Sequence, residues 1–246
     1  MNKKLILFLM MVFVPACFAT AQVKGDSTLR KAPAGLTAEK VVNNYIEAIG
    51  GKENLLKVKD RTTVMAGTVM GKAIKMTIYQ KQPDKMRQII DAGTFKQNIY
   101  FDGKKGIMEV AGKKLDVKGK ELEKLKFESS LYLLPELGSL GIKLKLEGVA
   151  NVNGKDAYKI DMILPSGTTW VQYYDPETWL KVEESKEINT PQGTFAQNTF
   201  FSNYREVSGV KYPFTVNQTM GKQKMEFTVT LILVNDGLND RLFPMN

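Results

Sequence analysis

Histidine is absent from the 246 residues of this sequence, and cysteine occurs once, at Cys17. Without histidine the chain can form neither a Ser-His pair nor a histidine general base, and one thiol cannot make a disulfide within the chain. Zinc sites of the usual Cys/His type are excluded for the same reason. The side chains left for catalysis are carboxylates, lysines, tyrosines and hydroxyls.

Long apolar segments are missing as well, except near the start of the chain. There, two lysines precede an apolar run from Leu5 to Val14, and Ala19-Thr20-Ala21 follows. This pattern predicts a secretory signal peptide over residues 1–21, with cleavage before Gln22. The run is shorter than the roughly 20 apolar residues of a transmembrane helix. We therefore expect an exported, soluble protein without a transmembrane segment.

The single cysteine offers an alternative processing route. Val14-Pro15-Ala16-Cys17 loosely resembles the lipobox at which bacterial lipoproteins are cleaved and acylated. The proline is atypical there, and the small-x-small site before Gln22 is complete, so ordinary cleavage is favoured. A lipid anchor on Cys17 stays open as the minority alternative.

Acidic residues are outnumbered by basic ones. The formal net charge of +9 becomes +7 once the two lysines of the expected signal peptide are removed. A basic protein favours anionic partners. However, lysines and acids are interleaved, as in residues 120–124, which indicates solvated surface and no nucleic-acid partner. Anionic lipid headgroups remain open as a minor partner.

An amphipathic helix is expected early in the chain, after a flexible tether over residues 22–36. Thr37 is a typical N-cap, and Ala38–Ile49 carries apolar residues at helical spacing. Gly50-Gly51 would end this helix, and a short second helical segment should follow at Glu53–Val58.

From Arg61 onward the apolar period changes to two, and turn signals such as Gly71-Lys72 and Asn153-Gly154 recur at short intervals. About eleven antiparallel strands are expected. Between them, Gly119–Glu128 has a charged helical pattern, and Ser129–Gly141 is apolar but neither strand-like nor fully helical. No boundary or repeat is evident, so residues 37–246 are predicted to form one domain.

Four segments, in this order, resemble a known family. The first, YIEAIGGKENLLKVK (Tyr45–Lys59), is similar to the start of Bacteroidetes-type outer membrane lipoprotein-sorting proteins. The others resemble the ending of the LolA/LolB-like superfamily of periplasmic lipoprotein carriers: YYDPETWLKVEE (Tyr173–Glu184), FSNYREVSGVKYPFTV (Phe201–Val216) and VNDGLNDRLFPMN (Val234–Asn246).

This resemblance implies a mainly β fold with a few helices (α+β): a single curved, unclosed antiparallel half-barrel whose helices cover the concave face. It also implies a cavity for acyl chains. The segments Ala38–Ile49 and Gly119–Gly141 would supply the lid, with apolar residues that face the cavity. These lid residues are Val42, Tyr45, Ile46, Ile49, Leu133, Leu134 and Leu137.

The family also tends to carry a proline followed by a conformationally important arginine on an early strand. Pro83 and Arg87 match that pattern. Another proline, Pro213, lies inside the strand expected at Val210–Met220, although a central strand needs the N–H that proline lacks. It would fit at an open edge, a bulge or a strand start, which a half-barrel retains. A closed lipocalin-like barrel is the alternative and leaves Pro213 harder to place.

Apolar residues recur on one face of several expected strands. The simplest interpretation is that the apolar residues on such a face form part of a packed hydrophobic core. Yet a curved sheet under a few short helices can have more apolar surface than its lid fills, and a dry cavity takes up apolar ligands. The residues expected to line it are Ile74, Met76, Ile78, Leu144, Leu146, Tyr158, Ile160, Met162, Leu164, Phe227, Val229 and Leu231.

Carboxylates between residues 161 and 187 raise the alternative of a glycosidase. Glu183 and Glu184 are adjacent in a strand and should point to opposite faces, so they cannot act as a pair. Asp175 and Glu177 lie in a proline turn, where such side chains bond the backbone. We therefore expect no catalytic residue, no metal and no cofactor.

The function expected from these patterns and the resemblance is that of a periplasmic, non-catalytic binding protein. It would hold a lipid or lipoprotein acyl chain as a carrier, chaperone or sensor in outer-membrane lipoprotein sorting, as a monomer that can contact envelope or outer-membrane proteins. The alternative is a scaffold or envelope-stress regulator that uses the same fold to bind a protein.

Overall fold

The computed structural model describes residues 29–69, 71–190, 193–221 and 223–245, and the expected signal peptide, its cleavage site and Cys17 lie outside them. No helix in these ranges is long and apolar enough to span a membrane. The strands and helices are β1 (Asp60–Val69), β2 (Lys72–Lys81), β3 (Lys85–Ala92), β4 (Phe95–Asp102), β5 (Gly106–Val110), β6 (Lys113–Val117), β7 (Lys143–Val152), β8 (Lys155–Ile163), β9 (Thr169–Tyr174), β10 (Lys181–Thr190), β11 (Gly193–Val207), β12 (Val210–Met220), β13 (Gln223–Val234), α1 (Ala38–Ala48), α2 (Gly51–Leu56), α3 (Gly119–Ser129) and the 3₁₀ turn η1 (Asp240–Leu242).

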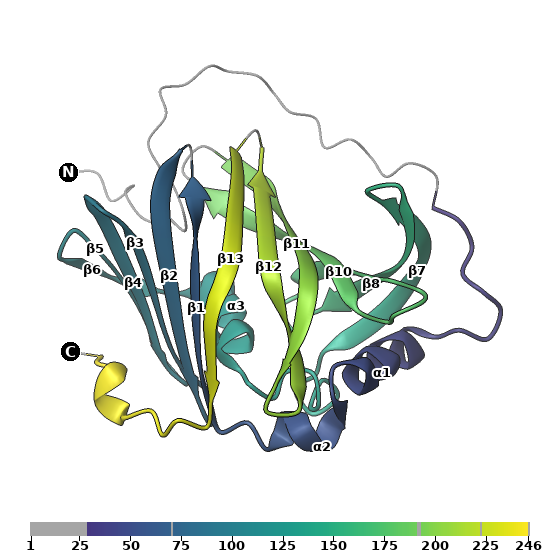
Figure 1. Cartoon of the computed structure of the whole chain (residues 1–246), viewed down its shortest axis with the longest axis horizontal. Helices are drawn as coiled ribbons and strands as arrows, with labels where there is room; N and C mark the ends of the chain where they lie inside the picture. The colour runs from purple at the N-terminus through teal and green to yellow at the C-terminus, as the bar shows by residue number, and fades with distance from the viewer. Residues whose placement is uncertain (1–28, 70, 191–192, 222, 246) are drawn as a thin grey trace.

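All strands belong to one antiparallel sheet, in the order β6-β5-β4-β3-β2-β1-β13-β12-β11-β10-β9-β8-β7. The sheet is open, because β6 and β7 are its two edges. Figure 1 shows β5 and β6 at one end of the curved sheet and β7 at the other, with α3 between them. The predicted unclosed, mainly β fold is confirmed, with thirteen strands instead of about eleven.

The chain passes from one edge of the sheet to the other through α3 and residues 130–142, which together cover the concave face. Leu125 of α3 packs with Phe101 and Met108, on the β3–β5 side. Phe127, half a turn later, packs with Met162 and Trp170 on the β8–β9 side. One short helix therefore joins both halves of the sheet, as its place in the connection between the two edges requires.

Helix α1 covers the β7–β9 end of the concave face. The Thr37 side chain caps it by accepting a hydrogen bond from the N–H of Lys40 (3.2 Å). The glycine after its C-cap is required by close packing: a Cβ on Gly50, which has φ +126°, would lie 2.1 Å from the carbonyl oxygen of Gly209. The N–H of Lys211 donates to the carbonyl of Ile49 (2.7 Å), so the helix end is fastened to the start of β12.

Pro213 lies where β12 is locally an edge. The pairing of β12 with β13 runs only from Met220 to Thr215, whereas its pairing with β11 continues to Val210. Figure 1 shows β12 and β13 diverging toward the end where α2 lies. A proline is tolerated at this position because no N–H is needed on the β13 side, which is the open-edge solution among those expected.

Part of the expected tether is attached to the domain. Arg30 forms an isolated antiparallel bridge with Val149 of β7, with hydrogen bonds of 2.9 and 2.8 Å in the two directions. Its guanidinium also pairs with Asp156. This short bridge covers a portion of the β7 edge, which would otherwise be free to pair with another strand.

Candidate functional site

The lid leaves part of the concave face unfilled. Two cavities of about 310 Å³ each lie between the sheet and the lid. This volume is at the lower end of the range of about 300–1,000 Å³ for small-molecule sites. They are two lobes of one space, which we call the central hollow, because they share Arg61, Glu128, Glu184, Lys186, Phe201, Tyr212 and Pro213.

The first lobe, the sheet lobe, lies over the middle strands. Its apolar floor comes from β1, β2, β3, β12 and β13, strands distant in sequence that the sheet order makes neighbours. Flexible, unbranched methionines among its residues can adapt to ligands of varied shape. The apolar residues of this floor are Met65, Met76, Ile78, Ile90, Val216, Phe227, Val229 and Ile232.

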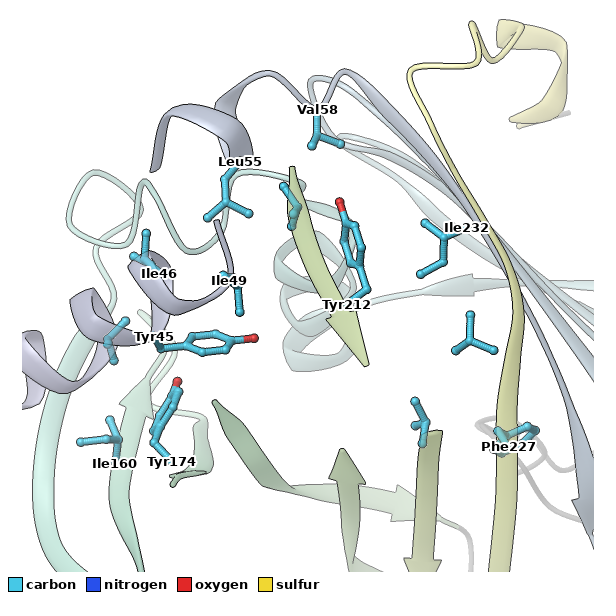
Figure 2. Packing of buried hydrophobic residues seen from close by; sticks show 14 of the residues in the cluster. Tyr45, Ile46, Ile49, Leu55, Val58, Ile160, Tyr174, Tyr212, Phe227 and Ile232 are labelled. Atoms are coloured by element: carbon cyan, nitrogen blue, oxygen red, sulfur yellow. The ribbon is translucent and has the colours of Figure 1, made fainter. Parts of the chain in front are cut away.

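The second lobe, the lid lobe, lies under the helices. Tyr45 of α1, Ile49 at the C-cap of that helix and Leu55 of α2 line it, together with Leu131, Leu133, Leu134 and Pro135 from the connecting segment. Figure 2 shows Ile49 and Leu55 facing Tyr212 of β12, with Ile232 on the other side of Tyr212. Tyr212 thus lies between the two lobes.

A third cavity, the lid groove, has a volume of about 710 Å³ and lies between α1 and residues 134–144. Apolar residues of both segments line it, and charged residues surround them. The apolar ones include Val42, Ile46, Leu134, Leu137 and Leu144, and the charged ones are Glu39, Glu47, Lys52 and Lys143.

A charged cluster lies in the wall of the central hollow. The carboxylate of Glu184, a residue that is 9% exposed, accepts from Lys181 (2.9 Å) and Lys186 (2.8 Å). Burial alone would raise the pKa of Glu184, but the two lysines outweigh it and hold that pKa well below its usual range. Burial would likewise lower the pKa of Lys186, yet Glu184 and Glu128 raise it. Both groups are therefore charged at neutral pH.

Aromatic and amide groups complete this cluster. Gln172 donates to Glu184 (2.9 Å) and accepts from the Tyr174 hydroxyl. The ammonium of Lys186 lies 3.8 Å from the centre of the Trp170 ring, a cation–π contact. Figure 2 shows the ring of Tyr45 beside Tyr174, with centroids 5.2 Å apart. Burial raises the pKa of both tyrosines, so they remain protonated.

A second polar connection holds the lid to the sheet. The buried Gln80 of β2 donates to the carbonyls of Glu128 (3.0 Å) and Ser129 (3.3 Å) at the end of α3. Arg61 of β1 donates to the Gln80 side chain and lies over the ring of Tyr212, 5.1 Å from its centre. The strands beside the hollow are thereby bonded to the helix above it.

Several predicted residues line these spaces. Met76, Ile78, Phe227 and Val229 lie on the floor of the sheet lobe, and Leu144 lies in the lid groove. All seven predicted lid residues line the lid lobe or the lid groove: Val42, Tyr45, Ile46, Ile49, Leu133, Leu134 and Leu137. These residues therefore lie beside a cavity, and their role in ligand binding stays a prediction.

The other predicted wall residues lie elsewhere. On β8, Ile160 and Met162 are fully buried, and Met162 packs with Phe127 and Trp170. The lid packs directly onto these positions of β8 and β9, so packed core, the plain interpretation, holds there. The predicted wall residues that line none of the three cavities are Ile74, Leu146, Tyr158, Ile160, Met162, Leu164 and Leu231.

Leu231 is on the opposite face from the one predicted. The register between β1 and β13 shifts at Val64/Met65, which leaves Thr230 as an extra residue in β13. Such a bulge reverses the alternation beyond it. Leu231 is consequently 43% exposed on the outer face, and Ile232 takes the inner position in its place.

The two residues mapped from the family pattern do not line the central hollow. Pro83 lies in the turn between β2 and β3. Arg87 donates to Asn98 (3.3 Å) and to the carbonyl of Leu242 (3.5 Å) in the C-terminal segment, and its neighbours in β3, Gln88 and Ile90, line the sheet lobe. Arg87 therefore lies on the outer face.

Arg61, Gln80, Gln172, Glu184 and Lys186 were not predicted from the sequence. Glu184 and Lys186 are two and four residues before the buried Ile188, so all three side chains point to the same face of β10. This alternation was the only feature of the sequence that could have indicated that the two charged residues face inward. Charged residues at alternate positions ordinarily mark the solvent face of a strand, so the sequence pattern would place Glu184 and Lys186 on the outer face.

Two of the carboxylates weighed for glycoside hydrolysis, Asp175 and Glu184, are engaged in structural contacts. Asp175 accepts from the N–H groups of Glu177 (2.9 Å) and Thr178 (2.8 Å), as expected of a turn residue. Burial would raise the pKa of Asp175, but these N–H groups outweigh it and lower that pKa. Glu184 is neutralised by two lysines, which suits structure better than acid catalysis.

No family model and no curated protein sequence match this chain. Solved structures do. A DUF1329 family protein from Desulfovibrio piger superposes with a TM-score of 0.56 at 14% identity, covering 85% of this chain and 97% of the other. A LolA superfamily protein from Nitrosomonas europaea gives 0.54 at 10% identity, covering 85% and 98%.

The chain has the LolA-like fold. A third structure with this fold, an outer membrane lipoprotein-sorting protein domain from Vibrio parahaemolyticus, gives a TM-score of 0.53 at 9% identity and covers 84% and 95% of the two chains. At such low identities the likeness concerns the fold. The function of this chain has to be argued from its own site.

Proposed function

We propose that this protein binds the acyl chain of a lipid or lipoprotein in the central hollow and acts as a non-catalytic periplasmic carrier. The sheet lobe is the observation that carries this proposal. Its floor is formed by apolar side chains from five strands, and the lid above it leaves a volume of about 310 Å³ unfilled. Apolar cavities in proteins bind apolar ligands.

The arrangement of the lid supports the same role. Residues 130–142 form turns instead of a continuous helix, and they contribute Leu131, Leu133 and Leu134 to the lid lobe. A lid without regular strands or a long helix has few backbone hydrogen bonds to break when it opens. Entry of an acyl chain at this side would need only local movement.

Occlusion of the sheet lobe tests the proposal. Val229→Phe enlarges an inward side chain of β13, whereas Leu231→Phe enlarges an outward one two residues later. The larger ring in the first variant should displace about two methylene groups of a fluorescent fatty-acyl probe, which lowers the affinity for that probe about tenfold. The matched Leu231→Phe variant should bind the probe like the wild type.

The melting temperature separates a hollow from a solid core. Phenylalanine fits into an existing cavity with little strain, whereas overpacking of a filled core costs about 1–3 kcal/mol. A wild-type protein that binds no acyl probe, together with a Val229→Phe variant that melts several degrees lower, would refute the proposal. Mass spectrometry of lipids that co-purify with the native protein would then show none, which would favour the protein-binding alternative.

A further inference from the structure

Arg61 has an unusual position for an arginine. It lies on β1 and lines both lobes of the central hollow, so its guanidinium stands where the apolar floor of the sheet lobe meets the lid lobe. Its contacts are the Gln80 side chain, which accepts a hydrogen bond from it, and the ring of Tyr212, 5.1 Å away. Both of these partners are uncharged.

The other charged residues in the wall of the hollow pair with one another, except Lys211, which lines the lid lobe at an exposed position. Lys181 pairs with Glu184 (2.9 Å), and Lys186 pairs with Glu184 (2.8 Å) and Glu128 (3.1 Å). Among the described residues no carboxylate forms an ion pair with Arg61, and its buried Nε has no hydrogen-bond partner. Arg61, Lys181 and Lys186 face two carboxylates, Glu128 and Glu184, and the exposed Lys211 adds a fourth cation, so the wall carries a net positive charge.

A partly buried cation without a counter-ion is unfavourable, and an anion that binds it removes this cost. The planar guanidinium is suited to carboxylate and phosphate, which it binds through two parallel N–H groups. Beside it, the sheet lobe offers Met65, Ile78 and Val229 to an apolar chain. The same cavity thus has an anion-binding group and an apolar floor.

We infer that the ligand is an amphiphile with an anionic headgroup, a carboxylate or a phosphate, which binds Arg61 while its acyl chain lies in the sheet lobe. This inference rests on the proposed acyl-chain function and adds the headgroup to it. The carboxylate of a free fatty acid and the phosphate of a phospholipid share the required chemistry.

Three amphiphiles with the same tail test the headgroup: hexadecanoic acid, hexadecyl phosphate and hexadecanol, each competing with a neutral fluorescent acyl probe. The charge-assisted hydrogen bonds to Arg61 make the two anions bind about 10- to 100-fold more tightly than the alcohol. A preference between the acid and the phosphate distinguishes a fatty acid from a phospholipid as the source.

Variants at one position assign the effect to Arg61. Arg61→Gln should abolish the preference for the anions, and Arg61→Lys should retain part of it. Lys75→Gln is the matched control, because it removes one positive charge from an exposed position next to the inward Met76. This control should keep the full preference, and the melting temperature of each variant reports its folding.

Equal binding of the three amphiphiles by the wild-type protein would overturn the headgroup inference and leave acyl binding intact. The same conclusion holds if Arg61→Gln and Lys75→Gln keep the same preference. If none of the three displaces the probe because nothing binds, the proposed function itself fails, and the headgroup inference fails with it.

Discussion

The two halves of the sheet meet the same lid in different ways. Over β8 and β9 the lid packs onto the inner face through Phe127, and residues such as Ile160 and Met162 have no exposed surface. Over β1–β3 and β11–β13 the lid does not reach the floor, and the sheet lobe remains. Apolar residues with the same alternation thus form packed core on β8 and β9 and the wall of a cavity on the middle strands.

The difference follows from where the chain crosses the sheet. The connection between β6 and β7 has to span the full concave face, and its single helix is only 11 residues long. Its last turn reaches β8 and β9 through Phe127, and the following turns stay on that side. The end of α3 that lies over the middle strands is polar: the carbonyls of Glu128 and Ser129 accept hydrogen bonds from Gln80 of β2.

The largest effect is expected at the boundary between the halves. Glu184→Gln removes the anion shared by Lys181 and Lys186 and leaves two partly buried ammonium groups with less compensation. Breaking a buried ion pair in this way costs about 3–5 kcal/mol. Because Lys186 retains Glu128, we expect the lower end of that range in chemical denaturation, whereas Glu187→Gln, at an exposed position of the same strand, should change stability by less than about 0.5 kcal/mol.

The same carboxylate predicts a pH dependence. The folded-state pKa of Glu184 is lowered, so its contribution is complete above the unfolded pKa of about 4.3 and is lost as the pH falls from there toward the folded value. The difference in melting temperature between wild type and Glu184→Gln should therefore shrink between about pH 6 and about pH 3. A constant difference over this interval would show that Glu184 is not held as a carboxylate.

A smaller effect compares the two halves directly through a matched pair of methionines. Met162→Ala opens a cavity in the filled half and should cost about 2–5 kcal/mol. Met76→Ala, on the floor of the sheet lobe, enlarges a space that already exists and should cost less than half as much. Thermal melts of both variants measure this, at about 2–4 °C per kcal/mol for a chain of this size. Equal losses would mean that both halves are packed alike.

Local chemistry made much of the fold predictable. The side chain of Thr37 suits a helix N-cap, and that of Asp175 suits a turn in which it accepts backbone N–H groups. Gly50-Gly51 can adopt the positive φ that ends a helix. Each of these residues is found in the structure that its chemistry favours. Pro213 indicated an open edge, a bulge or a strand start because proline lacks the N–H that a central strand needs, and the structure has the open edge.

The candidate site could be predicted only in part. The lid residues followed from helical spacing and the resemblance, but Leu231 could not be placed, since one extra residue at Thr230 reverses the face. Nor could the sequence separate Met76 from Met162, because the pattern of a strand does not show what lies above it. Arg61 and Glu184 were missed because the sequence pattern does not show which partners a charged side chain meets. In the structure, polar or charged partners on neighbouring residues and strands allow both side chains to face inward.

The most direct test of the account is to find where a bound acyl chain lies. A fatty acid with a photoreactive diazirine near the end of its chain can be bound, irradiated and located by mass spectrometry of the digested protein. The account predicts adducts on the inner residues of β1, β2, β12 and β13, such as Met65, Met76, Val216 and Phe227, competed by unlabelled hexadecanoic acid. Adducts confined to β8 or to the outer Leu231 and Leu233, or adducts that no competitor removes, would contradict it.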